Sequence, residues 1–261
     1  MTLKFLAVDG FNLIRRIFEA RDVQRASDMI QVIDATRASL LRAINQHNPT
    51  HVAVVMEDHD KTWRHLLLPE YKANRSETPI MLLNSLGQIE SSFKEIGVQC
   101  CSVPSYEADD VIATIATVVA DHLGDVIILS TDKTYLQLLS DHIHVFDHFA
   151  NLNCDAAFVK DRYGVEVFQY VDYLSLVGDK SNNIKGVTGI GKVTAASLLD
   201  EYQSLEAILN TETEDAKVTK VQLEAVFARR CQHLLTLKTD VSLNRNLKSF
   251  RLERPSQGIS D

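Results

Sequence analysis

Acidic residues recur where predicted strands end. They are Asp9, Glu57 with Asp58 beside it, the cluster Glu107, Asp109 and Asp110, and Asp132. Because the carboxyl ends of parallel strands meet at one edge of an open α/β sheet, we expect these side chains to converge there. Converging carboxylates repel one another unless a cation joins them, and hard oxygen ligands favour Mg²⁺ or Mn²⁺. The sequence therefore predicts a divalent-metal site, where the metal orients water and stabilises charge on a phosphoryl oxygen.

Short apolar runs precede these acids and are typical of buried strands. They are Leu3 to Val8, His51 to Met56, Val98 to Val103 and Val126 to Leu129. Helical periodicity marks the segments at about Ser27 to Asn45, Ile80 to Ile96, Tyr106 to Leu123 and Thr134 to Leu139. Strands that alternate with helices form βαβ units, so we predict an α/β fold with a mostly parallel sheet flanked by helices.

The acidic cluster at 107–110 opens one of these helices. Glu107 and Asp110 are three residues apart and share a helix face, with Asp109 beside them. The helix dipole explains a single acid in a first turn, and a helix cap explains Asp9 or Asp132 taken alone. Neither explanation accounts for three acids in four residues beside other acids at strand ends, which favours the metal site.

Composition and charge constrain the class of protein. The chain has 261 residues, 45% hydrophobic and 24% charged, which is ordinary for a globular protein with a substantial core. The net charge of −8 argues against a broad phosphate-binding surface, because nucleic acid is bound mainly through Lys and Arg. The cations are nevertheless concentrated, with three lysines and no acid between Lys180 and Leu199. Between Lys61 and Arg75 four cations face one acid. Both stretches indicate local contacts with phosphate.

Nothing in the sequence indicates a membrane or an oxidising compartment. The apolar run before Asp9 is too short for a signal-peptide core or a membrane span. The four cysteines, Cys100, Cys101, Cys154 and Cys231, have no zinc-type spacing, so free thiols are expected. We therefore expect a cytoplasmic protein that does not contact a membrane.

The hydrophobic pattern changes after about Cys154, where segments typical of helices replace those typical of buried strands. We place an α/β domain at 1–154, a helical subdomain at 155–235 and a C-terminal tail at 236–261. Within the subdomain, Gly186, Gly189 and Gly191 precede a helix from Lys192 to about Tyr202. Such glycines let backbone amides and a helix N-terminus approach a phosphate closely.

This glycine turn has two readings. A nucleotide P-loop is the weaker one, because Val193 stands where the hydroxyl that binds the metal is required. A turn between helices with this spacing is more typical of a helix-hairpin-helix that grips a DNA backbone. The residues that would contact DNA are Gly189, Ile190, Gly191, Lys192, Val193 and Thr194.

A second basic segment combines cations with aromatic side chains. Trp63, Arg64 and His65 are followed by the run from Tyr71 to Arg75. This combination is typical of segments that contact phosphates and stack on bases. The alternative is a solvated surface segment in which Trp63 packs into the body of the protein. Because a metal site is also predicted, we favour the interpretation that this segment contacts nucleic acid.

Over roughly positions 3 to 200 the chain resembles the 5′ nucleases, which are the flap endonucleases and the 5′-nuclease domain of bacterial DNA polymerase I. The matching segments are Val8-Asp9-Gly10 with Asn12 and Arg15, Tyr71 to Arg75, Tyr106 to Asp110, Asp132-Lys133 with Gln137-Leu138, and Gly178-Asp179 through Asn183-Ile184 to Gly191. The length, without a polymerase, resembles the stand-alone bacterial members. The resemblance implies a PIN-like fold with a helix-hairpin-helix (H3TH) subdomain, in which two metals drive in-line attack of water on a phosphodiester.

The resemblance also implies roles for individual residues. The metal ligands would be Asp9, Glu57, Glu107, Asp109, Asp110, Asp132 and Asp179. Lys72 and Arg75 would lie in an arch, at about 58–90, with Lys72 stabilising phosphate charge and Arg15 near the scissile phosphate. A K⁺ ion would join the hairpin to DNA through the backbone carbonyls of Leu176, Val177, Lys185, Val187 and Ile190.

Three positions depart from the pattern of these nucleases. Thr134 and Asn182 stand where aspartates of the second metal site are usual, which should weaken that site. Glu57 replaces the usual aspartate after the second strand, with Asp58 as a possible substitute.

The leading hypothesis is a Mg²⁺-dependent, structure-specific flap endonuclease that cuts 5′ flaps of DNA during replication or repair. Its partner would be DNA with a 5′ flap or a junction between single strand and duplex. One rival is a catalytically weak or inactive protein that binds such junctions, which Thr134 and Asn182 support. Another rival is an RNA-cleaving PIN nuclease, although it does not predict a helix-hairpin-helix.

Overall fold

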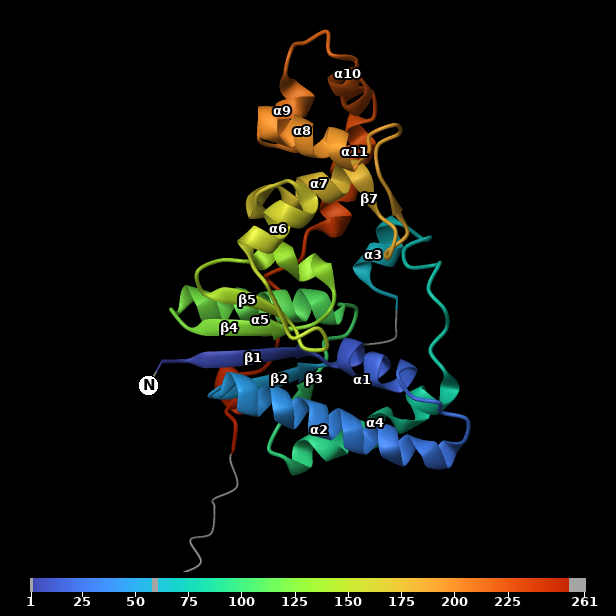
Figure 1. Ribbon diagram of the computed structural model, residues 1–261, viewed down its shortest axis with the longest axis vertical. Coiled ribbons are helices and arrows are strands. Elements are labelled where there is room, and N and C mark those ends of the chain that lie inside the picture. The colour runs from blue at the N-terminus through green and yellow to red at the C-terminus, as the bar shows by residue number, and fades with distance from the viewer. Residues whose placement is uncertain (1, 58–60, 254–261) are drawn as a thin grey trace, which may run out of the picture.

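The body of the protein is a six-stranded sheet in the order β3-β2-β1-β4-β5-β6. The computed structural model describes residues 2–57 and 61–253 (Figure 1). The strands are β1 (Lys4–Asp9), β2 (His51–Val55), β3 (Gln99–Cys101), β4 (Asp125–Leu129), β5 (Ile143–Asp147) and β6 (Leu152–Cys154). All neighbouring pairs are parallel except β5 and β6. The predicted mostly parallel sheet is confirmed.

Helices cover both faces of this sheet (Figure 1). Leu6 and Val8 of β1 pack with α1 (Gly10–Glu19), α2 (Met29–His47) and α4 (Ile80–Glu95). Phe5 and Ala7 point to the other face and pack with α5 (Ala108–Asp121). Successive side chains of a strand point to opposite faces, so the continuous apolar run of β1 reflects burial on both sides.

Most of the predicted elements of this body are present, and two strands were missed. The predicted helix at 134–139 is the 3₁₀ helix η2 (Lys133–Leu138), directly after β4. The missed strands are β5 and the short β6 beside it. In β5 only Ile143 and Val145 point into the core, with His144 between them, so its apolar signal is too short to identify a strand.

The remaining helices form the upper part of the molecule in Figure 1. They are α6 (Ala156–Tyr163), α7 (Tyr170–Val177), α8 (Lys192–Tyr202), α9 (Leu205–Asn210), α10 (Ala216–Leu223) and α11 (Ala225–Leu235). Between α7 and α8 the chain forms a two-stranded ribbon, β7 (Gly178–Asp179) and β8 (Ile184–Lys185). The short helix α3 (Trp63–Leu67) lies between these helices and the sheet.

The segment that follows α11 returns to the α/β body. Leu237, Val241 and Phe250 are buried in the main core cluster, and Arg251 forms a β-bridge with His51 beside β2. Residues 236–253 of the predicted tail are therefore packed against the body, because their apolar side chains fill its core. No helix in the described part of the chain is long and apolar enough to cross a membrane.

Candidate active site

A cavity of about 390 Å³ lies at the carboxyl edge of the sheet. Seven residues predicted for the site line it: Asp9, Glu57, Asp109, Asp132, Arg15, Lys72 and Arg75. A neighbouring cavity of about 510 Å³ shares Asp132 and contains Asp179 and Thr134. The structure thus brings most of the predicted carboxylates together at the edge where strands β1 and β4 end. Asp58 lies outside the described residues.

Asp9 is both a helix cap and a member of the cavity. Its Oδ1 accepts the backbone N–H of Asn12 at 3.1 Å, which starts α1, and its Oδ2 accepts the hydroxyl of Ser130 at 2.9 Å. Burial raises the pKa of Asp9 to about 6, and the nearby charges of Asp132 and Glu57 act in the same direction. The cap explanation considered for the sequence is therefore correct but incomplete.

Asp109 is the second acid of the cavity, and it is half-buried. Burial raises the pKa of its carboxyl well above the ordinary value, and the charge of Asp132 adds to this effect. The hydroxyl of Tyr135 donates to Asp109 Oδ1 at 2.7 Å and lies 3.3 Å from Asp9 Oδ2. Tyr135 was not predicted, because no spacing or charge in the sequence distinguishes it from an ordinary core tyrosine. Burial and the carboxylates also raise the pKa of its phenol, so the phenol remains a donor.

Asp132 completes this group of carboxylates at the end of β4. Its Oδ1 accepts the backbone N–H and the hydroxyl of Thr134, at 2.8 and 2.7 Å. Among the described residues, no group of three acidic, histidine or cysteine side chains stands ready to hold a metal ion. The raised pKa values of Asp9 and Asp109 nevertheless reflect burial and mutual repulsion, which a divalent cation would relieve. The carboxylate oxygens of Asp9, Asp109 and Asp132 are chemically suited to a hard cation.

Glu107 is not free to line this cavity, because it is engaged with cations. Lys72 Nζ lies 2.5 Å from its Oε1, and Arg64 donates to its Oε2 at 2.7 Å. Tyr71 donates to the same Oε2 at 3.0 Å. Burial alone would raise the pKa of Glu107, but Lys72 and Arg64 outweigh burial and lower it. The consequence is a fixed ammonium group of Lys72 at the wall of the cavity.

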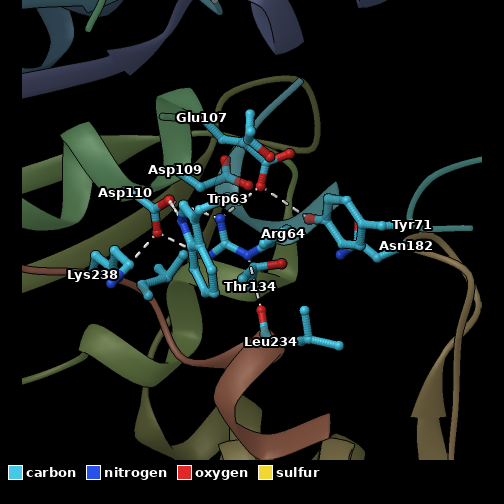
Figure 2. A network of polar contacts seen from close by, with 12 residues as sticks. Trp63, Arg64, Tyr71, Glu107, Asp109, Asp110, Thr134, Asn182, Leu234 and Lys238 are labelled. Carbon is cyan, nitrogen blue, oxygen red and sulfur yellow. Dashed lines mark hydrogen bonds and ion pairs between the residues drawn. The ribbon is translucent and has the colours of Figure 1, made fainter. Parts of the chain in front are cut away.

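Asp110 points away from both cavities into a buried ion pair (Figure 2). Arg64 grips it with two hydrogen bonds of 2.7 and 2.8 Å, and Trp63 Nε1 donates to it at 2.9 Å. The backbone N–H of Lys238 donates to its other oxygen at 3.0 Å. The structure therefore does not bring Asp110 to the predicted metal site, since both of its oxygens already accept hydrogen bonds from two segments of the chain, α3 and the backbone at Lys238.

The same network corrects the expectation for Trp63 and Arg64. Arg64 is 2% exposed, and its Nε donates to the carbonyl of Leu234 at the end of α11 (Figure 2). Trp63 lies against this guanidinium, 4.4 Å from its ring centre to Cζ. The expectation that these side chains contact nucleic acid is wrong, because they hold α3 between α5 and α11.

Residues of the predicted arch contact the ribbon beside the hairpin. Arg75 donates to Asn182 Oδ1 at 2.9 Å, and the backbone N–H of Lys72 donates to the carbonyl of Asn182 at 3.0 Å. The side-chain amide of Asn182 donates to Asp179 at 2.6 Å. Asn182 thus connects Arg75 to Asp179 by two hydrogen bonds. Arg15 donates to Ser76 at 2.8 Å, at the rim of the same cavity.

The hairpin itself is held by a close approach of backbones at Gly186. A Cβ atom there would lie 2.3 Å from the carbonyl carbon of Val177 and 2.4 Å from the carbonyl oxygen of Leu176. The Leu176 carbonyl accepts the N–H of Val187 at 2.9 Å, and that of Val187 accepts the N–H of Ile190 at 3.1 Å. The carbonyl of Lys185 accepts the thiol of Cys231 at 3.3 Å.

The turn that follows exposes backbone and one cation. Gly189, Gly191 and Lys192 are exposed, and Val193 is 85% exposed. The side chain of Ile190 is buried, so it anchors the turn rather than presenting a surface. Open space surrounds the Cα of Gly191 at the start of α8, which leaves its backbone accessible.

Comparison with known proteins identifies similar sequences over the whole chain. The family model described as 5′-3′ exonuclease, N-terminal resolvase-like domain, matches residues 4–164. The model described as 5′-3′ exonuclease, C-terminal SAM fold, matches residues 165–258. A Colwellia psychrerythraea protein named flap endonuclease Xni is 38% identical over 98% of this chain and 94% of its own length.

Solved structures share the fold. The T5 5′-exonuclease with bound divalent metal ions (zinc) has a TM-score of 0.77 at 21% identity, over 90% of each chain. A bacteriophage T5 flap endonuclease in a pseudo-enzyme-product complex with DNA and metal ions has a TM-score of 0.74 at 20% identity. That match covers 89% of this chain and 88% of the other. The predicted PIN-like fold with a helical subdomain is thereby confirmed.

Proposed function

The chain belongs to the 5′-3′ exonuclease family, and from that premise we propose that it is a Mg²⁺-dependent endonuclease that cuts 5′ flaps of DNA in replication or repair. The observation that carries the proposal is the cavity where Asp9, Asp109 and Asp132 converge beside the ammonium group of Lys72. Buried acids with raised pKa values beside a fixed cation fit a site that binds a metal ion and a phosphate together.

Asp9, Asp109 and Asp132 would hold the metal, with Glu57 at the rim of the cavity. The ion, when bound, polarises water and neutralises charge on the phosphodiester. Asp179 in the neighbouring cavity remains a candidate ligand for a second ion. Thr134 and Asn182 stand where two further acidic ligands of that ion are usual, so Asp179 would bind it without them. Glu107 contributes indirectly, because it holds Lys72 in place.

The cations of the cavity would bind the phosphodiester. Lys72 would stabilise the negative charge that develops on the phosphate, since it is already held at the wall by Glu107. Arg15 and Arg75 lie at the same cavity and would orient the flanking phosphates. In this proposal the scissile bond would lie between the acids and the cations.

The helical part would grip the duplex on one side of the flap. Its exposed turn at Gly189, Gly191 and Lys192 offers backbone amides, a helix N-terminus and a cation to one strand. We also propose that a K⁺ ion joins the hairpin to a phosphate through backbone carbonyls such as those of Leu176 and Val187, each of which accepts one N–H within the turn.

A panel of labelled substrates tests this function. The panel comprises a 5′-flap DNA duplex, a blunt duplex of the same sequence and a single-stranded RNA, each in Mg²⁺ with K⁺. The proposal expects cutting of the flap near its junction and little cutting of the other two. Preferred cutting of RNA would contradict the flap proposal and favour an RNA-cleaving PIN nuclease.

One further outcome of the same panel is specific to this chain. Thr134 and Asn182 act as hydrogen-bond donors to Asp132 and Asp179, where second-site acids are usual. This supports the rival of a junction-binding protein with weak or no catalysis. Tight binding of the flap without cutting, in Mn²⁺ as well as Mg²⁺, would establish that rival instead.

A further inference from the structure

The hydroxyl of Tyr135 occupies the position between two of the cavity acids. Tyr135 lies in η2 and is completely buried. Its hydroxyl is 2.7 Å from Asp109 Oδ1 and 3.3 Å from Asp9 Oδ2. These two acids come from different elements, β1 and the first turn of α5, so a single side chain from a third element touches both.

The hydrogen-bond distances show that Asp109 and Asp9 have different donors. A phenol has one hydrogen, and the shorter contact assigns it to Asp109. Asp9 has its own donors, the hydroxyl of Ser130 at 2.9 Å and the N–H of Asn12 at 3.1 Å. Within the described residues, Tyr135 is the one hydrogen-bond donor to the carboxylate of Asp109. The orientation of Asp109 therefore depends on this phenol.

The contact also lies on the protein side of the two acids. Asp9 and Asp109 both line the cavity, whereas Tyr135 does not. Among the described residues Asp109 Oδ2 accepts no hydrogen bond, so it is available to the cavity. A neutral donor behind two like charges favours their close approach, which a cation in front of them requires.

We propose that Tyr135 is a positioning residue that fixes Asp109 beside Asp9 so that the two carboxylates bind one divalent cation together. This inference rests on the proposed function, because it concerns the metal of that site. Residues that orient metal ligands by hydrogen bonds typically change metal affinity by about 10–100-fold when they are removed. Thr134, in the same short helix, serves Asp132 in the corresponding way.

Tyr135→Phe removes only the hydroxyl and keeps the buried ring. The matched control is Tyr202→Phe, since Tyr202 also packs against the main core cluster but lines neither of the two cavities. Mn²⁺ binding is measured by calorimetry without DNA, and thermal unfolding checks the fold of each variant. We expect Tyr135→Phe to weaken Mn²⁺ binding by about 10-fold or more and Tyr202→Phe to leave it unchanged.

A double-mutant cycle with Asp109→Asn separates positioning from loss of stability. If Tyr135 acts through Asp109, then Tyr135→Phe changes Mn²⁺ affinity little in the Asp109→Asn background. Equal losses in both backgrounds, or wild-type affinity in Tyr135→Phe, would overturn the inference while leaving the proposed function intact. A wild type that binds no Mn²⁺ would overturn both.

Discussion

At the scale of single residues, the cavity disfavours the ionised form of two of its acids, Asp9 and Asp109. Asp9 is buried and Asp109 is half-buried beside Asp132, and burial and repulsion raise the pKa of both, so ionising them costs the isolated protein free energy. Glu107 and Asp110 are almost fully buried but have cations against them, namely Lys72 and Arg64. The first pair is therefore suited to bind a metal, and the second pair stabilises the walls around it.

The raised pKa of Asp9 predicts a pH dependence of stability. Between its ordinary value of 3.8 and about 6 in the folded protein, the folded chain holds a proton that the unfolded chain has released. Stability therefore falls as pH rises through this window, by up to about 3 kcal/mol for the shift to 6. We expect wild type in chelator to lose stability relative to Asp9→Asn between pH 4 and 7, as measured by urea unfolding.

Excess Mn²⁺ should abolish this loss, because the cation replaces the proton on the carboxylates. A difference between wild type and Asp9→Asn that stays constant across the pH range would contradict the burial of an ionised Asp9.

Arg64 predicts a large loss of stability on substitution. Arg64→Gln leaves Asp110 buried without its cation and removes one of the two cations beside Glu107, which typically costs about 3–5 kcal/mol. The control is Arg37→Gln, because Arg37 pairs with exposed Glu95 at 3.0 Å and its loss should cost about 1 kcal/mol or less. Urea unfolding compares the two variants, and equal losses would show that the buried network contributes no more than a surface pair.

At the scale of elements, the acids could be predicted but their partners could not. Asp9 ends β1 and Asp132 lies shortly after β4, and the apolar runs of both strands are visible in the sequence, so their convergence at the carboxyl edge of the sheet could be predicted. The pairing of Arg64 with Asp110 joins residues 46 positions apart, and no local pattern encodes it. Tyr135 has the same limitation, because its partners lie in β1 and α5.

The hairpin offers a test with two glycines. A Cβ at Gly186 would collide with backbone atoms of Val177 and Leu176, whereas a Cβ at Gly191 would meet no atom within 4 Å. We expect Gly186→Ala to cost about 1–3 kcal/mol or more and Gly191→Ala less than about 1 kcal/mol, both measured by thermal unfolding. Comparable stability of the two variants would contradict the close backbone approach beneath the hairpin.

The ribbon and η2 permit a test of the second metal site. Asn182 donates to Asp179, and Thr134 donates to Asp132. Replacing both donors with aspartates puts like charges in contact, so Thr134→Asp with Asn182→Asp should be less stable than wild type in chelator. We expect Mn²⁺ calorimetry to detect one more bound ion per chain in this variant than in wild type.

The control for this experiment is Thr134→Asn, which changes the side chain without adding charge. An unchanged number of bound ions in the double variant would show that the cavity containing Asp179 is not shaped for a second metal.

At the scale of the whole molecule, the site lies where the α/β body meets the helical part. The arch residues Lys72 and Arg75 contact Asn182 in the ribbon beside the hairpin. Arg64 joins α5 to the end of α11 (Figure 2). The proposed DNA contacts at the hairpin and the proposed chemistry at the cavity are therefore connected by packed side chains. The net charge of −8 is compatible with this function because Arg15, Lys72 and Arg75 line the cavity and Lys192 is exposed at the turn.

The most direct test of metal-dependent flap cutting is single-turnover cleavage of a labelled 5′-flap duplex across a Mg²⁺ titration. Wild type is compared with Asp109→Asn and with Asp121→Asn, whose exposed acid ends the same helix α5. We expect cutting near the junction that requires Mg²⁺, at least about 100-fold slower in Asp109→Asn with flap binding retained, and unchanged in Asp121→Asn. Cutting by Asp109→Asn at the wild-type rate, or no cutting by wild type, would contradict the assignment of this cavity as the catalytic site.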